Sequence, residues 1–114
     1  MSKRTESDLV RACLEYLSAK GIMAWRNNQG SFAFESKGRR RYFKAGAPGS
    51  GDIFAILPGG RFLSIECKAP KGRISEAQAE WETRVSMAGA AAMVVRGLDT
   101  LDLFITDLLR EGER

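Results

Sequence analysis

The sequence contains no histidine, and this absence removes several kinds of active site. Ser-His-Asp and Cys-His catalysis both need an imidazole base, and a His-ligated zinc site needs imidazole ligands. Any catalysis by this chain would therefore depend on carboxylates, lysine and, where one is bound, a metal ion.

Long apolar runs and closely spaced cysteines are also missing. The apolar stretches are a few residues long, whereas a membrane-spanning helix needs about 20, so we expect no membrane partner. The N-terminal "MSKRTESD" carries charges without an apolar segment behind it, so we expect no signal peptide and a cytoplasmic protein. The two cysteines, Cys13 and Cys67, stand far apart within apolar patterns, which predicts core thiols rather than a disulfide or zinc site.

The order of the predicted elements indicates one small α/β domain over residues 1–114. The length and the hydrophobic fraction of 44% fit a single globular domain. Apolar periodicity, capping residues and glycine-rich turns predict the following elements. They are helices over 6–20, 75–89 and 98–111, strands over 22–27, 52–57, 61–68 and 91–96, and a hairpin over 29–47 with its turn at 36–39. The order α-β-β-β-β-β-α-β-α predicts a central mixed β-sheet flanked by helices.

The net charge of +4 is concentrated in residues 29–47. This segment has five basic residues and one acid, while the rest of the chain has equal numbers of each. Its basic residues are interleaved with aromatic ones, a combination that suits a nucleic-acid backbone. The candidate binding residues are Lys37, Arg39, Arg40, Arg41 and Lys44. A solvated hairpin whose charges maintain solubility explains the segment equally well.

Two acids and a lysine stand on strands that otherwise look apolar. Glu66 and Lys68 share one face of the strand 61–68, roughly 7 Å apart. The turn "PGG" makes positions 52 and 66 nearly symmetric about residue 59, so an antiparallel hairpin would place Asp52 opposite or nearly opposite Glu66, with Cβ atoms about 5 Å apart. Carboxylates that close repel each other, and a shared hard cation such as Mg²⁺ relieves the repulsion.

A third acid, Glu6, lies on the helical stripe of Leu9, Val10 and Cys13, so it could line the same cleft. Together these groups suit phosphodiester hydrolysis. A cation held by two carboxylates polarises a phosphoryl oxygen and lowers the pKa of a bound water. A neighbouring lysine orients that water or stabilises the charge that develops on the phosphate.

These residues resemble the PD-(D/E)xK nuclease superfamily, whose "D…(D/E)xK" pattern is matched by Asp52, Glu66 and Lys68. The finer resemblance is to the virus-type replication-repair nuclease (VRR-NUC) domain, and it covers nearly the whole chain. Its pieces stand here in order as Glu6, "RNNQG" at 26–30, "GAPGSGD" at 46–52 and "ECKAPKGRISEAQ" at 66–78. One departure is Gly51, where many relatives have proline. We expect it to change the stiffness of the turn and not the chemistry.

The resemblance implies a restriction-endonuclease-like core and a deoxyribonuclease that depends on Mg²⁺ or Mn²⁺. It implies that Asp52 and Glu66 are metal ligands, that the backbone carbonyl of Cys67 is a third ligand, and that Lys68 is the catalytic lysine. Glu6 would complete the metal site directly or through water. Gln78 would orient the catalytic lysine or a nearby strand end.

The resemblance also implies the substrate and the assembly. Standalone members of this kind are phage or bacterial enzymes similar to Holliday junction resolvases, which implies a homodimer that cuts branched DNA in the cytoplasm of a bacterium or a phage-infected cell. A four-way junction has two-fold symmetry and needs two cuts, which suits a C₂ dimer. The aromatic residues of segment 29–47 and the helix 98–111 are both candidate dimer interfaces.

Each site residue also has a structural explanation of its own, and two other functions stay open. Asp52 fits a glycine-rich turn, Glu66 and Lys68 a surface ion pair, Glu6 a first-turn acid and Gln78 a capping box with Ser75. Asn27 and Asn28 fit strand-end hydrogen bonding and stand outside the catalytic set. The alternative functions are a non-catalytic DNA-binding module of the same fold and a sequence-specific restriction-type nuclease.

Overall fold

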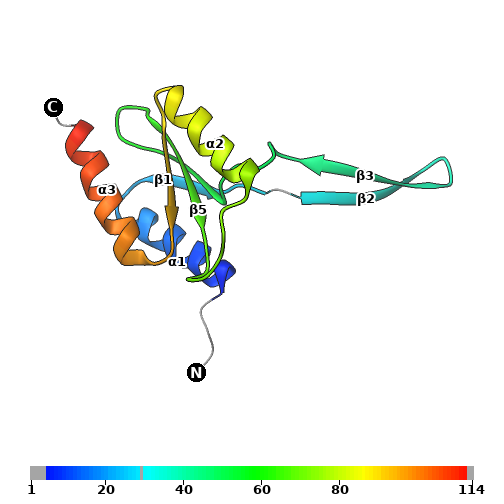
Figure 1. Cartoon of the computed structure of the whole chain (residues 1–114), viewed down its shortest axis with the longest axis horizontal. Coiled ribbons are helices and arrows are strands. Elements are labelled where there is room, and N and C mark those ends of the chain that lie inside the picture. Colours follow the sequence, from blue (N-terminus) through cyan, green and yellow to red (C-terminus); the bar gives the residue numbers. More distant parts are fainter. Residues whose placement is uncertain (1–4, 29, 113–114) are drawn as a thin grey trace.

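The computed structural model describes residues 5–28 and 30–112, and its elements follow the predicted order (Figure 1). The helices are α1 (Glu6–Ala19), α2 (Glu76–Met87) and α3 (Leu98–Gly112). The strands are β1 (Met23–Arg26), β2 (Gly30–Ser36), β3 (Arg39–Ala45), β4 (Ile53–Ile56), β5 (Phe62–Cys67) and β6 (Ala91–Val95). Within the described residues, no helix is both long and apolar enough to cross a membrane.

Four strands form the central sheet in the order β1-β4-β5-β6. The pairs β1–β4 and β4–β5 are antiparallel, and β5–β6 is parallel, so the sheet is mixed as predicted. The parallel pair requires a crossover connection, which α2 supplies between β5 and β6. The strand β5, one of the two inner strands of the sheet, is buried on both faces from Leu63 to Cys67.

Helices cover both faces of the sheet. On one face, Leu63 and Ile65 pack into the main core with α1 and α3, and the thiols of Cys13 and Cys67 lie 4.0 Å apart there. Both cysteines are buried core residues, as predicted, and the contact with Cys13 together with burial raises the pKa of the Cys67 thiol. On the other face, α2 is linked to β5 by a hydrogen bond: the indole Nε1 of Trp81 donates to the Ser64 hydroxyl at 2.9 Å.

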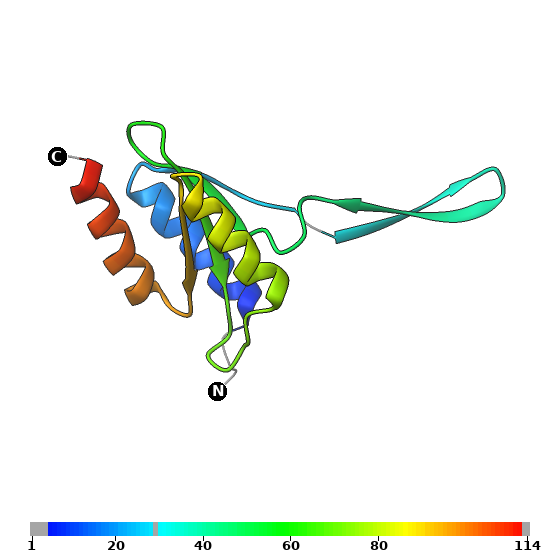
Figure 2. The same ribbon diagram turned by 45° about the horizontal axis from the view of Figure 1, so that its top comes forward.

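The strands β2 and β3 form a separate two-stranded sheet that projects from the body of the molecule (Figures 1 and 2). We call this hairpin, residues 30–45, the arm. Its turn is the predicted one, with Lys37 and Gly38 both at positive φ, 53° and 73°, as a two-residue type I′ turn requires. The arm accounts for the elongated shape of the molecule, whose longest dimension is 57 Å against 41 and 27 Å in the other directions.

Candidate active site

The predicted hairpin symmetry about "PGG" holds in the structure. The β4–β5 register pairs Ile53 with Ile65, and continuing it by one residue places Asp52 opposite Glu66. Asp52 lies immediately before β4, where its N–H donates to the carbonyl of Ile65 at 2.8 Å. Its carboxylate oxygen Oδ2 accepts the Cys67 N–H, also at 2.8 Å. Asp52 is therefore fixed at the end of β5 rather than free in a turn.

Glu66 is a buried carboxylate, with an exposed fraction of 7%. Its Oε1 accepts a hydrogen bond of 2.5 Å from Gln78 Nε2 and lies 3.8 Å from the ammonium of Lys68. Its Oε2 accepts no hydrogen bond from residues 5–28 or 30–112. Burial and the neighbouring Asp52 carboxylate raise the pKa of Glu66 to about 8, although Lys68 opposes the shift. A buried carboxylate oxygen in this environment is suited to bind a cation.

Lys68 lies just after β5, on the same side as Glu66, as strand alternation predicts. Its backbone N–H donates to the Val95 carbonyl of β6 at 3.0 Å, which holds this end of the strand in place. The side chains of Lys68 and Glu66 are only 13% and 9% exposed. They do not form the exposed surface pair that was one interpretation of the sequence.

Glu6 reaches the rim of the same corner from the first turn of α1. It is exposed, and its Oε1 accepts the Ala69 N–H of the loop after β5 at 3.2 Å. A Cβ at Gly72 would lie 3.3 Å from this oxygen and 3.4 Å from Lys68 Cδ, so Glu6 and Lys68 flank the same small residue. Across residues 5–28 and 30–112, no three histidine, cysteine or acidic side chains gather closely enough to hold a metal ion. The structure thus joins Asp52 with Glu66 but leaves Glu6 at the edge.

Gln78 takes part both in the cap of α2 and in a contact with Glu66. Its amide oxygen accepts the Ser75 N–H at 2.9 Å, and the Ser75 hydroxyl accepts the Gln78 N–H at 3.1 Å, which completes a capping box on α2. Its amide nitrogen donates to Glu66, so Gln78 reaches Lys68 only through that carboxylate.

Two residues with a structural role at the site were not in the predicted set. Asn27 donates from Nδ2 to the Ser50 hydroxyl and to the Gly51 carbonyl, both at 2.9 Å, and its N–H donates to the Asp52 carbonyl at 2.8 Å. This agrees with the strand-end role expected for Asn27 and shows that it holds the turn before Asp52. Arg96 donates to three carbonyl oxygens of the loop 69–72, at 2.7, 3.4 and 2.8 Å. The motif "RNNQG" pointed to Asn27, whereas a single arginine after a strand gave no signal for Arg96.

The glycine-rich segment before Asp52 packs closely against β5 and α2. A Cβ at Gly51 would lie 2.4 Å from the Ser64 hydroxyl and 2.8 Å from the Ile65 carbonyl. Gly49, at φ +75°, would place a Cβ 2.2 Å from the Ala77 carbonyl of α2. Gly51 therefore allows the turn to pack closely against β5.

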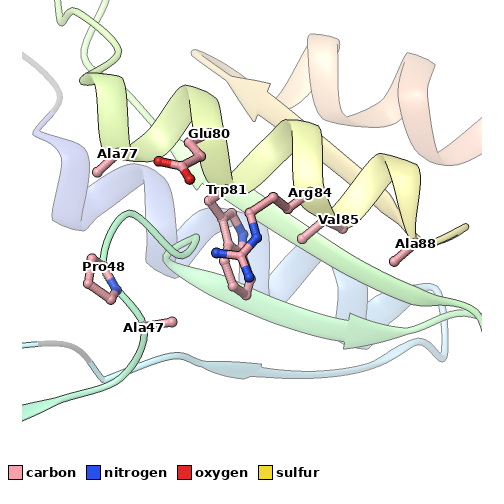
Figure 3. Close-up of a pocket in the computed structure, with 8 residues that line it drawn as sticks. All are labelled: Ala47, Pro48, Ala77, Glu80, Trp81, Arg84, Val85 and Ala88. Carbon is pink, nitrogen blue, oxygen red and sulfur yellow. The ribbon is translucent and has the colours of Figure 1, made fainter.

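Two cavities flank this segment. One of about 200 Å³ lies beside the site and is lined by Val10, Arg26, Asn27, Asn28 and Asp52. The other, of about 490 Å³, lies between residues 47–48 and α2 (Figure 3). Figure 3 shows Trp81 and Arg84 of α2 at the second cavity, whose lining includes none of Asp52, Glu66 and Lys68. Of these two cavities, the first therefore reaches an acidic residue of the candidate site, Asp52.

The basic residues singled out in the sequence lie on the arm and not in the candidate active site. Lys37, Arg39, Arg40 and Arg41 are all exposed. The side chain of Lys44 lies outside the described part of the structure. The acidic site and the exposed basic residues of the arm therefore lie in different parts of the molecule, which meet at the root of the arm.

The comparisons with known proteins bear on the fold. No protein-family model matches the sequence, and no curated protein matches it. A solved structure described as "VRR_NUC domain" is similar, with a TM-score of 0.61 and 22% sequence identity over 90% of this chain and 96% of that chain. The mixed sheet flanked by helices agrees with that architecture. This chain therefore has the fold of a VRR_NUC domain, as the sequence motifs predicted.

Proposed function

We propose that this protein is a divalent-metal-dependent nuclease that hydrolyses phosphodiester bonds in DNA. The observation that carries the proposal is the buried Glu66 carboxylate, which lies between the carboxylate of Asp52 and the ammonium of Lys68 and keeps one oxygen without a hydrogen bond among the described residues. Two adjoining acids and a lysine, in a chain with the fold of a VRR_NUC domain, support nuclease chemistry over a purely structural role.

The donors at this site fit a hard cation such as Mg²⁺ or Mn²⁺, because they are carboxylate and carbonyl oxygens. Asp52, Glu66 and the Cys67 carbonyl would hold the ion, and Glu6 would join them directly or through water. When bound, such an ion supplies Lewis-acid polarisation of the phosphate and a water of lowered pKa.

The other site residues have roles of their own. Lys68 provides a positive charge that orients the attacking water or stabilises the negative charge that grows on the phosphate. Gln78 holds one oxygen of Glu66, so that the other keeps a fixed direction. The bond from Cys67 N–H holds Asp52 in position before any substrate arrives.

We further propose that the substrate is branched DNA, as for a Holliday junction resolvase, and that the protein acts as a homodimer. Two sites related by two-fold symmetry suit the two cuts that a four-way junction needs. Exposed apolar side chains on α3, Leu103 and Phe104, support that helix as the dimer interface. Light scattering on the purified protein measures the mass in solution, and a monomer at micromolar concentration would contradict the dimer.

A cleavage assay tests the proposed function. Purified protein is incubated with labelled four-way junction, flap, linear duplex and single strand, in Mg²⁺, in Mn²⁺ and in EDTA. We expect cutting of the branched substrates with either metal and none in EDTA. Asp52→Asn and Lys68→Ala should bind the junction without cutting it.

The alternatives predict different results in the same assay. Binding without cutting under every metal condition would identify a non-catalytic DNA-binding module. Cutting of linear duplex at one sequence would identify a restriction-type nuclease. Normal cutting by either variant would remove that residue from the mechanism.

A further inference from the structure

The arm divides its basic residues between two faces. In the β2–β3 register, Arg40 is the direct partner of Glu35, whereas Arg39 pairs with Ser36 and Arg41 with Phe34. Cross-strand partners lie on the same face of a hairpin, and successive residues of one strand alternate between faces. Arg39 and Arg41 therefore share one face, and Arg40 shares the opposite face with a carboxylate.

Among the three arginines, this division separates two whose cross-strand partners are uncharged from one whose partner is a carboxylate. Opposite charges on directly paired residues attract each other, so the positive potential near Arg40 is reduced by Glu35. The partners of Arg39 and Arg41 in the register are uncharged. All three arginines are exposed, and Lys37 at the turn adds a further exposed charge at the tip.

The arm also carries these charges away from the active site. Seven residues of β2 at roughly 3.3 Å each span about 23 Å. The arm begins two residues after Asn28 and ends seven residues before Asp52, and Asn27 bonds the turn that precedes Asp52, so the root of the arm lies near the site. Its tip projects away from the body of the molecule (Figure 2). DNA phosphates along one strand follow each other at about 3.4 Å of helix axis. DNA that ran from the site along the arm would therefore meet the tip at phosphates several nucleotides from the one that is cut.

From these observations we propose that the arm binds the phosphate backbone of the DNA substrate outside the cleavage site, through the face that carries Arg39 and Arg41. This inference rests on the proposed function, because it assigns the DNA a path from the acidic site along the arm. The face of Arg40 and Glu35 points away from that backbone. The sequence had placed all the basic residues of segment 29–47 in one group, and the register gives them different roles.

Two neighbouring single variants provide a matched test. Arg41→Ala and Arg40→Ala each remove one exposed positive charge from the same strand of the arm, and neither residue packs in the protein core. Binding to the labelled four-way junction is measured in EDTA by fluorescence anisotropy between 50 and 200 mM salt. We expect Arg41→Ala to weaken binding roughly 3- to 10-fold and to reduce the salt slope by about 0.9, the value for one lost phosphate contact. Arg40→Ala should change both quantities by less than half as much.

Cleavage kinetics in Mg²⁺ give a second readout. Because the proposed contact is far from the scissile phosphate, Arg41→Ala should raise KM and leave kcat within about twofold. Circular dichroism and the thermal midpoint of both variants should match the wild type.

The outcomes separate this inference from the proposed function. Equal effects of Arg40→Ala and Arg41→Ala, or no effect of Arg41→Ala, would overturn the assignment of the binding face even where the wild type cuts DNA normally. A wild type that binds with the expected salt slope and never cuts would refute the nuclease and leave the binding face standing.

Discussion

Gln78 fastens Glu66 to the start of α2: its amide nitrogen lies 2.5 Å from Glu66 Oε1, while its amide oxygen accepts the Ser75 N–H. One amide thus links the cap of a helix to a buried carboxylate of the candidate active site. Any movement of this first helical turn changes the direction of the carboxylate.

Gln78→Ala and Ser75→Ala should separate capping from catalysis. Both variants lose part of the capping box, and each should lower the free energy of unfolding by about 1 kcal/mol in urea titrations. Only Gln78→Ala also releases Glu66, so only it should lower kcat for junction cleavage, by roughly tenfold or more. A comparable loss of cleavage in Ser75→Ala would mean that Gln78 acts through the helix alone.

Glu66→Gln should stabilise the protein while abolishing its activity. The amide keeps an oxygen for the bond from Gln78 and removes a buried negative charge that adjoins Asp52. Without added metal, in EDTA at pH 8, we expect the free energy of unfolding to rise by about 1–2 kcal/mol and the thermal midpoint to rise by several degrees.

Glu80→Gln is the control for this variant, because Glu80 is an exposed carboxylate on α2. It should change the free energy of unfolding by less than about 0.5 kcal/mol. A lower thermal midpoint for Glu66→Gln in EDTA would show that the charge of Glu66 stabilises the folded protein even without a bound metal.

Tyr16 gives the stability a dependence on alkaline pH. Burial, together with the hydrogen bond of 2.5 Å to Asp102 that links α1 to α3, raises the pKa of Tyr16 from 10.0 to about 12. The protonated phenol is therefore favoured in the folded state. Its stabilising effect is complete below pH 10 and is lost as the pH rises from 10 to 12.

Tyr16→Phe should lower the free energy of unfolding by about 1 kcal/mol at pH 8. The difference from the wild type should shrink between pH 10 and pH 12, because the phenol ionises there in the unfolded state while the folded protein still keeps it protonated. Urea unfolding at a series of pH values measures this difference. A difference that stays constant from pH 8 to pH 12 would contradict the role of the Asp102 bond.

The features that sequence analysis predicted well are the ones that local chemistry decides. Thr5 and Ser75 mark where α1 and α2 begin, because each side chain accepts the backbone N–H three residues later, a local pattern that the sequence already carries. The short turn "PGG" limits the register of β4 against β5, which is why Asp52 and Glu66 could be placed opposite each other from the sequence.

The features that were not predicted depend on packing between distant segments. Arg96 bonds a loop more than 20 residues earlier in the chain, and no pattern within either segment encodes that contact. The tight approach of Gly51 to Ser64 likewise depends on how the turn meets β5. The hairpin itself was predicted, but its separation from the central sheet was not, because strand periodicity does not say which partner a strand takes.

The Asn27 bonds fix the root of the arm relative to Asp52. They tie the end of β1, where the chain departs toward the arm, to the turn of Ser50 and Gly51, where it has returned, and Asp52 follows directly. Close packing of Gly49 and Gly51 leaves this junction little room to shift. In the proposed nuclease, the fixed span from the tip of the arm to Asp52 would therefore set how far from an arm-bound phosphate the strand is cut.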